Sequence, residues 1–156
     1  MKRISRIKFS SLCLLLFVNF SLHAFSFGGT YQESCKLYED AKRKKIKDPK
    51  YQLGPFEKDA LAMGIFYDFK EDGTYTKKLG QNRILQKAGL LEENKRLLET
   101  VREKGRWTYN EEASLITLKK GDRKTFIKVF EKKGDELDVR ILDNEVTWKK
   151  LTLEKV

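Results

Sequence analysis

The chain contains few of the residues on which most catalytic and metal sites depend. Its 156 residues include one histidine, two cysteines and two prolines. The sequence has no closely spaced cysteine pair, no HExxH, no glycine-rich phosphate loop and no GxSxG, so the common zinc, nucleotide and hydrolase sites are not predicted. Carboxylates are plentiful, but none has the spacing typical of a metal or glycosidase site. We therefore predict a protein that is not an enzyme, with no catalytic residues, no metal and no cofactor.

The first 24 residues have the three parts of a secretory signal peptide. A basic start is followed by an almost uncharged apolar run from Phe9 to Leu22, and Ala24 supplies the small residue before cleavage. The apolar run is too short for a comfortable membrane span. We expect residues 1–24 to be a signal peptide and residues 25–156 to form a single domain, exported to the periplasm or secreted.

Removal of this segment would leave very little thiol or imidazole chemistry. His23 and Cys13 lie within it, so the exported domain would have no histidine and a single cysteine, Cys35. A lone cysteine cannot form an intramolecular disulfide, so the fold must be stabilised by its core. The cysteine of a lipoprotein normally follows the apolar run directly. Neither cysteine has that position, so a lipid anchor is disfavoured.

The exported domain would remain basic. The first 24 residues carry four cations and no carboxylate, so the formal net charge falls from +10 to about +6. Outside the cytoplasm, this charge favours an anionic lipid, glycan or protein surface as a partner over nucleic acid. The densest basic run is the candidate contact for such a surface, and ordinary solvated surface is the alternative. Its residues are Lys42, Arg43, Lys44 and Lys45.

Short strands separated by turns are predicted for most of the chain. Residues 65–70 alternate in polarity, with Ile65, Tyr67 and Phe69 on one face, and a turn containing Gly73 joins them to a second strand over 74–79. Further strands are expected at 27–32, 105–109, 113–119, 123–131, 137–141 and 146–153. Turns about every ten residues predict an antiparallel up-and-down meander. We predict a mainly β fold with helical insertions, as an eight-stranded barrel or a strongly curved sheet.

Two segments interrupt this pattern. Residues 34–63 begin with a helix-friendly stretch and then contain Asp48-Pro49 and Gly54-Pro55, where turns are expected. Residues 82–104 carry apolar side chains at helical spacing, and Gly89 divides them, so one or two helices are predicted. The simplest interpretation of this apolar stripe is packing against the sheet, and a partner-binding helix is the alternative.

Three short motifs resemble those of the bacterial lipocalin-like (calycin-type) exported proteins. They are an aromatic strand running into Asp-Gly-Thr-Tyr at residues 66–75, a Gly-x-Trp strand at 105–109, and Leu-Ile-Thr-Leu at 115–118. The resemblance covers roughly Phe27 to the C-terminus. It implies a calycin-like barrel whose interior can hold a small ligand.

Aromatic side chains are the candidate lining of a ligand pocket in such a barrel. The candidates are Tyr67, Phe69, Tyr75, Trp107, Tyr109, Phe126, Phe130 and Trp148. The alternative is that these residues simply form the core, because aromatic side chains dominate small β cores.

Three functions remain open from the sequence. The first is a non-enzymatic module that binds a small apolar or amphipathic ligand. The second is a surface protein that docks on an anionic glycan, lipid or protein through its basic face, and the third is a small protein inhibitor of an enzyme. A continuous cavity of about 300 Å³ or more would favour the first, and an interior filled by side chains would favour the second.

Overall fold

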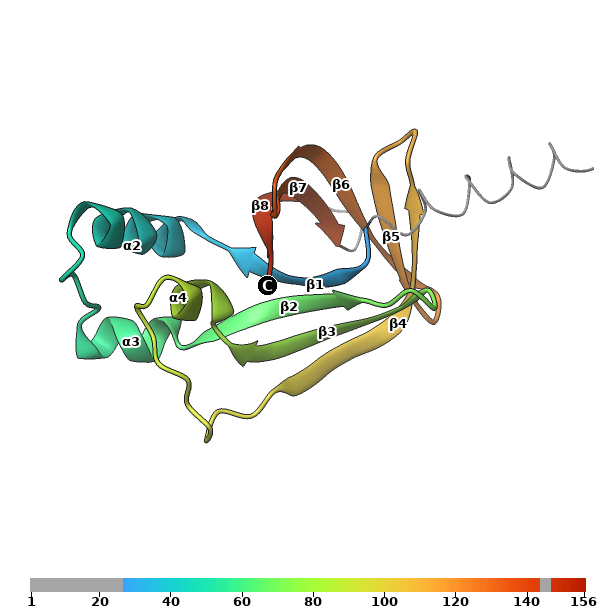
Figure 1. Cartoon of the computed structure of the whole chain (residues 1–156). Coiled ribbons are helices and arrows are strands. Elements are labelled where there is room, and N and C mark those ends of the chain that lie inside the picture. Colours follow the sequence, from blue (N-terminus) through green and yellow to red (C-terminus); the bar gives the residue numbers. More distant parts are fainter. Residues whose placement is uncertain (1–26, 144–146) are drawn as a thin grey trace, which may run out of the picture.

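The barrel predicted from the sequence is present and closed. The computed structural model describes residues 27–143 and 147–156, and within these ranges eight antiparallel strands each pair with the next along the chain (Figure 1). Pairing of the last strand with the first closes the ring. The strands are β1 (Gly29–Ser34), β2 (Met63–Phe69), β3 (Thr74–Gln81), β4 (Thr100–Asn110), β5 (Leu115–Lys120), β6 (Arg123–Lys133), β7 (Glu136–Asp143) and β8 (Thr147–Lys155).

The β2–β3 hairpin forms as its sequence predicts. Gly73 has a φ of 77°, which a residue without a Cβ adopts at little cost. The Asp72 carboxylate accepts hydrogen bonds from the Thr74 amide at 2.8 Å and the Thr74 hydroxyl at 2.6 Å. The Trp107 indole donates to the Lys70 carbonyl at 2.9 Å, so β4 is tied to the same turn.

The barrel interior is filled by apolar and aromatic side chains. Inward positions alternate along the strands, and the buried residues form one cluster around the barrel axis. Gly105 makes room for this packing, because a Cβ there would lie 2.2 Å from the Lys119 carbonyl oxygen and 2.7 Å from the Tyr75 ring. The cluster consists of Phe27, Tyr31, Tyr67, Phe69, Tyr75, Trp107, Ile116, Leu118, Ile127, Leu137, Val139, Ile141 and Leu153.

Three helices gather at one end of the molecule (Figure 1). Helices α2 (Lys36–Lys47) and α3 (Pro55–Leu61) connect β1 to β2, and α4 (Arg83–Lys87) follows β3. A second apolar cluster lies among them, and no helix of the described residues is long and apolar enough to cross a membrane. The buried members of this cluster are Ala41, Leu53, Leu85 and Leu90.

A buried amide network fixes the helices to the barrel. The Gln32 amide of β1 donates to the Asn82 side-chain oxygen at 2.7 Å. The Gln32 oxygen accepts from the backbone amides of Arg83 and Ile84, at 2.8 and 3.2 Å. Asn82 in turn donates to the Leu61 carbonyl at 2.9 Å. All buried polar atoms of the Gln32 and Asn82 side chains therefore have hydrogen-bond partners, and the start of α4 is held against β1.

The helical prediction for residues 82–104 is wrong over most of its length. Only Arg83–Lys87 is helical, because Gly89 adopts a φ of 67° directly after the helix. Residues 100–104 belong to β4, where they pair with β3 instead. The apolar spacing that indicated a long helix does not mark one buried face, since Leu90 is buried whereas Leu98 and Val101 are exposed.

Candidate functional site

Most of the aromatic residues proposed to line a pocket are packed in the core. Tyr67, Phe69, Tyr75 and Trp107 are all at most 9% exposed, and Tyr109 packs against the same cluster. The rings contact one another directly, with the centroids of Phe69 and Trp107 separated by 5.2 Å. Among the described residues, this packing fills the centre of the barrel.

Phe126 and Phe130 do not join this core. Ile127 points inward, so its neighbour Phe126 points out of the barrel. Phe130 lies at a break in the β6–β7 register and is 57% exposed, with the Arg140 guanidinium 4.8 Å from its ring centroid. The prediction that these two line an interior pocket is therefore wrong. The Trp148 side chain lies outside the described part of the chain.

A small polar cavity lies inside the barrel at the end from which α2 leaves, called the barrel mouth below. Its volume is about 180 Å³. The Lys77 ammonium lies 5.2 Å from the centroid of the Tyr67 ring. The cavity is lined by Tyr67, Lys77, Arg102, Glu103, Leu118, Arg123, Thr125 and Ile141.

Two of the lining residues, Tyr67 and Glu103, form hydrogen bonds between a tyrosine hydroxyl and a carboxylate. The Tyr67 hydroxyl donates to Glu33 at 3.0 Å, and the Tyr75 hydroxyl donates to Glu103 at 2.5 Å. The other Glu103 oxygen lies 3.9 Å from the Lys120 ammonium. Both carboxylates are thus already engaged by donors of the protein.

A larger groove opens beside the cavity, between α2 and the strand ends. Its volume is about 670 Å³, and Met63, Ile65, Leu79 and Leu151 supply its apolar surface. Ile65 is 36% exposed although its position on β2 points inward. Charged and polar residues of α2 and β8 form the rim, including Lys36, Arg43 and Lys150.

Tyr38 of α2 fixes one wall of the groove. Its hydroxyl donates to the Met63 carbonyl at 3.2 Å. Burial raises the pKa of Tyr38 above its ordinary value, and the neighbouring Cys35 and Glu33 raise it further. The phenol therefore stays protonated and available as a donor.

The sequence prediction passed over the cations of the cavity. Lys77 and Arg123 are two of many charged residues in the predicted strands, and Arg102 lies in the segment predicted to be helical. Alternation along β3 contains the missing signal, because Tyr75, Lys77 and Leu79 share a face and the aromatic residue marks that face as the inner one.

The four residues of the predicted anionic-surface contact have different environments. The Lys42 ammonium is enclosed by Glu154, Glu39 and Glu136 at 3.0, 3.4 and 3.7 Å, and the side chain is only 21% exposed. Burial acts to lower the pKa of Lys42, but the hydrogen bonds and charges of Glu154 and Glu39 outweigh it and raise the pKa. The three carboxylates lie close enough together to bind a cation, and the Lys42 ammonium lies among them and balances one of their three charges.

Lys45 also has structural partners, whereas Arg43 and Lys44 remain exposed. The Lys45 ammonium donates to the carbonyls of Pro49 and Tyr51, at 2.7 and 3.0 Å. Arg43 and Lys44 are exposed. Of the four predicted contact residues, Arg43 and Lys44 are therefore the two placed to meet an external surface.

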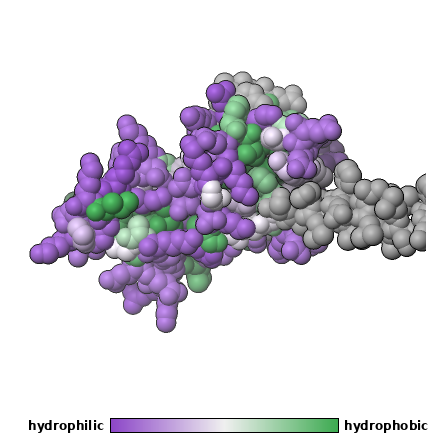
Figure 2. All heavy atoms as spheres, turned by 45° about the horizontal axis from the view of Figure 1, so that its top comes forward, coloured by the Kyte–Doolittle hydropathy of each residue, from purple (hydrophilic) through white to green (hydrophobic). Residues whose placement is uncertain are grey.

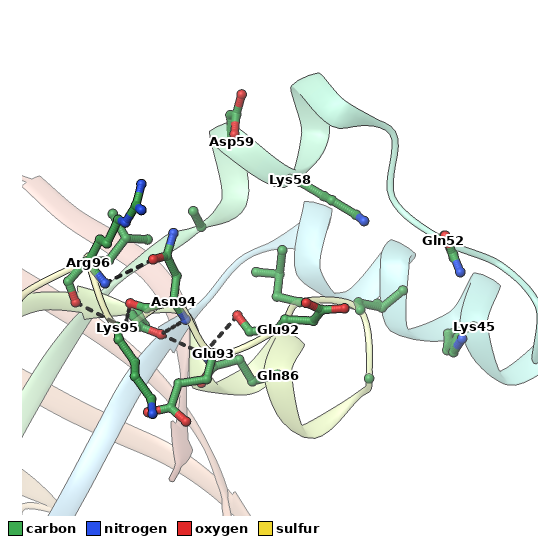
Figure 3. A pocket seen from close by; sticks show the side chains of 16 residues that line it. Lys45, Gln52, Lys58, Asp59, Gln86, Glu92, Glu93, Asn94, Lys95 and Arg96 are labelled. Carbon is green, nitrogen blue, oxygen red and sulfur yellow. Dashed lines mark hydrogen bonds between the residues drawn. The ribbon is translucent and has the colours of Figure 1, made fainter.

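A third hollow, of about 560 Å³, lies among the helices and the loop after α4. Gln81 holds this loop by accepting from the Asn94 amide at 2.9 Å and donating to the Leu97 carbonyl at 3.0 Å. Figure 3 shows that the labelled charged side chains, such as Asp59 and Lys95, point in different directions rather than toward one point. This hollow therefore has no convergent set of polar groups.

Comparison with known proteins adds little to this geometry. The sequence matches no protein-family model and no curated protein. Among solved structures, the chain is similar to the crystal structure of Echinococcus granulosus fatty-acid-binding protein 1. The identity is 13%, the alignment covers 83% of this chain and 97% of that chain, and the TM-score is 0.33. A similarity this low carries no information about function, which must be inferred from the residues of this chain.

Proposed function

We propose that the protein is an exported, non-enzymatic module that binds a small amphipathic ligand at the barrel mouth. The observation that carries this proposal is the apolar surface left uncovered in the groove under α2. Ile65, Leu79 and Leu151 line it, and its volume of about 670 Å³ lies within the range typical of small-molecule sites.

The ligand site differs from the one expected from the aromatic residues. The barrel centre is packed, and the cavity within it, at about 180 Å³, is smaller than a typical ligand pocket. The ligand therefore occupies the mouth, with the packed aromatic residues forming the floor beneath it.

A binding assay with paired variants tests this site. Wild-type protein should bind dansyl-undecanoic acid saturably, and native mass spectrometry of protein purified from its own cells should find a lipid-sized mass. Replacing both Ile65 and Leu79 with Gln should weaken dye binding at least about tenfold, because two apolar contacts are lost. The control is Leu98→Gln, which lies outside the groove and is exposed. Unchanged binding by the double variant, or absence of saturable binding in the wild type, would contradict the proposal.

Export rests on the signal-like segment at residues 1–24. Sequencing of the mature N-terminus should begin near Phe25. A cytosolic protein that retained Met1 to Ala24 would overturn the localisation and would restore nucleic acid as a partner for the basic chain.

Docking on an anionic surface is the second candidate function, and the packed barrel centre favours it. In the view of Figure 2, hydrophilic side chains cover most of the helical end of the molecule. Arg43 and Lys44 are the test positions, since Lys42 and Lys45 have structural partners. Binding to heparin or anionic liposomes should fall steeply with salt, because the Debye length shortens from about 10 Å at 0.1 M to about 3 Å at 1 M. Replacing both residues with Glu should abolish this binding, because the charge is then reversed. Binding that survives both changes would exclude this function.

A further inference from the structure

Strand β4 pairs with β5 along only part of its length. The register runs from Asn110 back to Arg106, which lies opposite Lys119, and β5 ends at Lys120. Residues 100–104 of β4 continue beyond that point and pair with β3 on one side. Among the residues that the structure describes, no strand pairs with their other side, and in Figure 1 this half of β4 lies below β3 at the edge of the barrel. The edge formed by residues 100–104, called the open edge below, is therefore unpaired.

Lys104 directs its main-chain groups to the open side. The Trp107 amide donates to the Gly73 carbonyl at 2.8 Å, which is the side of β3. Because successive residues of a strand direct their amides and carbonyls to alternate sides, those of Arg106 and Lys104 point away from β3. Arg106 meets Lys119 of β5 there, whereas Lys104 has no strand opposite it in the described part of the chain. The Lys104 amide and carbonyl can thus pair with an additional strand.

Exposed cations surround the open edge. Three lie on β4 and two on the end of the β5–β6 hairpin, which is close to β4 because the Lys119 carbonyl packs against Gly105. The carboxylates of residues 100–106 and 119–124 are Glu103, which is engaged by the Tyr75 hydroxyl and the Lys120 ammonium, and the exposed Asp122. The surface around the edge is therefore positively charged. Its exposed cations are Arg102, Lys104, Arg106, Lys119 and Lys124.

This charge determines which kind of strand can pair with the open edge. Trp107 is buried inside the barrel, so Arg106 and Lys104 point outward from it. Antiparallel pairing of two copies of the chain would place these cations and Arg102 opposite the same residues of the other copy, and like charges in such positions are destabilising. Carboxylates in those positions are attracted instead. The edge therefore disfavours a second copy and favours an acidic strand.

The opening also leaves room for the inward side chains of an added strand. The cavity of about 180 Å³ is lined from both sides of the opening, by Arg102 and Glu103 of β4 and by Leu118 and Thr125 of β5 and β6. Side chains of a strand alternate between its two faces. A residue of the added strand that faces inward therefore meets this cavity rather than the filled core.

We propose that the open edge of β4 is a docking site for an acidic segment of another protein, which binds in an extended conformation as an additional strand. Its main chain pairs with the amide and carbonyl of Lys104, and its carboxylates lie against Lys104 and Arg106 on the outside of the barrel. Acidic residues that alternate with small apolar ones suit both faces. The open edge shares no residue with the groove proposed for the ligand, so this inference goes beyond the proposed function and is tested independently of it.

Peptides that differ only in which amides are blocked test the strand pairing. The probe is a fluorescein-labelled peptide of alternating glutamate and valine, and its binding is followed by fluorescence anisotropy. The wild type should bind it and should not bind the peptide in which lysine replaces every glutamate. N-methylation of the glutamates blocks the amides on one edge of the peptide, and N-methylation of the valines blocks those on the other. One methylated peptide should lose at least about tenfold in affinity, and the other should bind like the unmodified peptide.

Variants of the protein locate the site. Lys104→Pro removes an amide that no strand of the described residues uses, and it should abolish binding because proline cannot donate a hydrogen bond. Lys104→Ala loses the same charge but keeps the amide, so it should bind at least about tenfold more tightly than Lys104→Pro. Lys104→Glu should weaken binding, whereas the matched control Lys132→Glu, at an exposed position of β6 paired with β7, should leave it unchanged.

Each other result counts against the proposal. Absence of binding by the wild type, equal binding of the lysine peptide, or equal effects of the two methylation patterns would overturn it. A wild-type dimer that Lys104→Pro dissociates in analytical ultracentrifugation would assign the edge to a second copy and overturn it as well. If circular dichroism shows that Lys104→Pro does not fold, the two methylated peptides decide the question, because they leave the protein unchanged.

Discussion

Replacement of Trp107 by Ala tests both the packed core and the strand faces assigned to it. The side chain is 9% exposed, and a tryptophan buries about 200 Å² on folding, which at about 25 cal/mol per Å² amounts to roughly 5 kcal/mol. This value is an upper limit because the denatured chain is itself partly collapsed. The variant also loses the indole hydrogen bond to the Lys70 carbonyl, 2.9 Å long. We expect Trp107→Ala to lower the free energy of unfolding by about 4 kcal/mol, within the range for large-to-small core changes.

Urea unfolding followed by far-UV circular dichroism measures this loss without relying on tryptophan fluorescence. With a slope of about 2 kcal/mol per M, the midpoint should fall by about 2 M. Trp107→Phe keeps a ring beside Phe69 and should cost less. Phe130→Ala removes an exposed ring of comparable size and should cost less than about 1 kcal/mol. If Trp107→Ala costs under about 1 kcal/mol, the indole is not buried in solution and the inward face of β4 has been assigned wrongly.

Three further changes should have distinct effects. Gly105→Ala should lower the free energy of unfolding by about 3 kcal/mol in the same assay, because its Cβ would lie 2.2 Å from the Lys119 carbonyl. A loss below about 0.5 kcal/mol would show that β4 and β5 can separate freely. Asn82→Leu should lower the free energy of unfolding by about 3 kcal/mol and speed hydrogen exchange of the α4 amides, because buried donors and acceptors lose their partner. Unchanged hydrogen exchange would contradict the role of the Gln32–Asn82 network in holding α4. The hydrogen bond from Lys78 lowers the pKa of Glu99, against burial, which raises it. The stabilisation by Glu99 is therefore present above the ordinary glutamate pKa and is lost as the pH falls through the lowered pKa. The free energies of unfolding of Glu99→Gln and the wild type should thus differ most at neutral pH and approach each other in acid.

Local patterns were sufficient to predict the strands and their order. Alternation and turn chemistry act over a few residues, so the hairpin around Gly73 and the strand containing Trp107 could be found without knowledge of the fold. The count of strands then indicated a barrel, and closure through β1 and β8 is what the structure adds.

Long-range pairing explains the failures. Residues 100–104 have apolar neighbours at helical spacing, but hydrogen bonding to β3 makes them strand, and nothing local reveals that partner. The register break between Val129 and Glu131 changes which residues of β6 face inward, so Phe130 could not be placed by alternation alone. Lys77 was missed for a different reason, since a charged residue in a strand is usually solvated.

The pairing of β1 with β8 also affects how the barrel is made. These strands are the first and last of the ring, and Tyr31 pairs with Lys155 across it. Hairpins between consecutive strands need only short loops, whereas this seam joins residues more than a hundred positions apart and bears the greatest loop-closure entropy. Until β8 has been synthesised and has reached β1, both strands present unpaired edges that can pair with other chains. The seam is therefore the last part of the ring able to form and the step most exposed to aggregation.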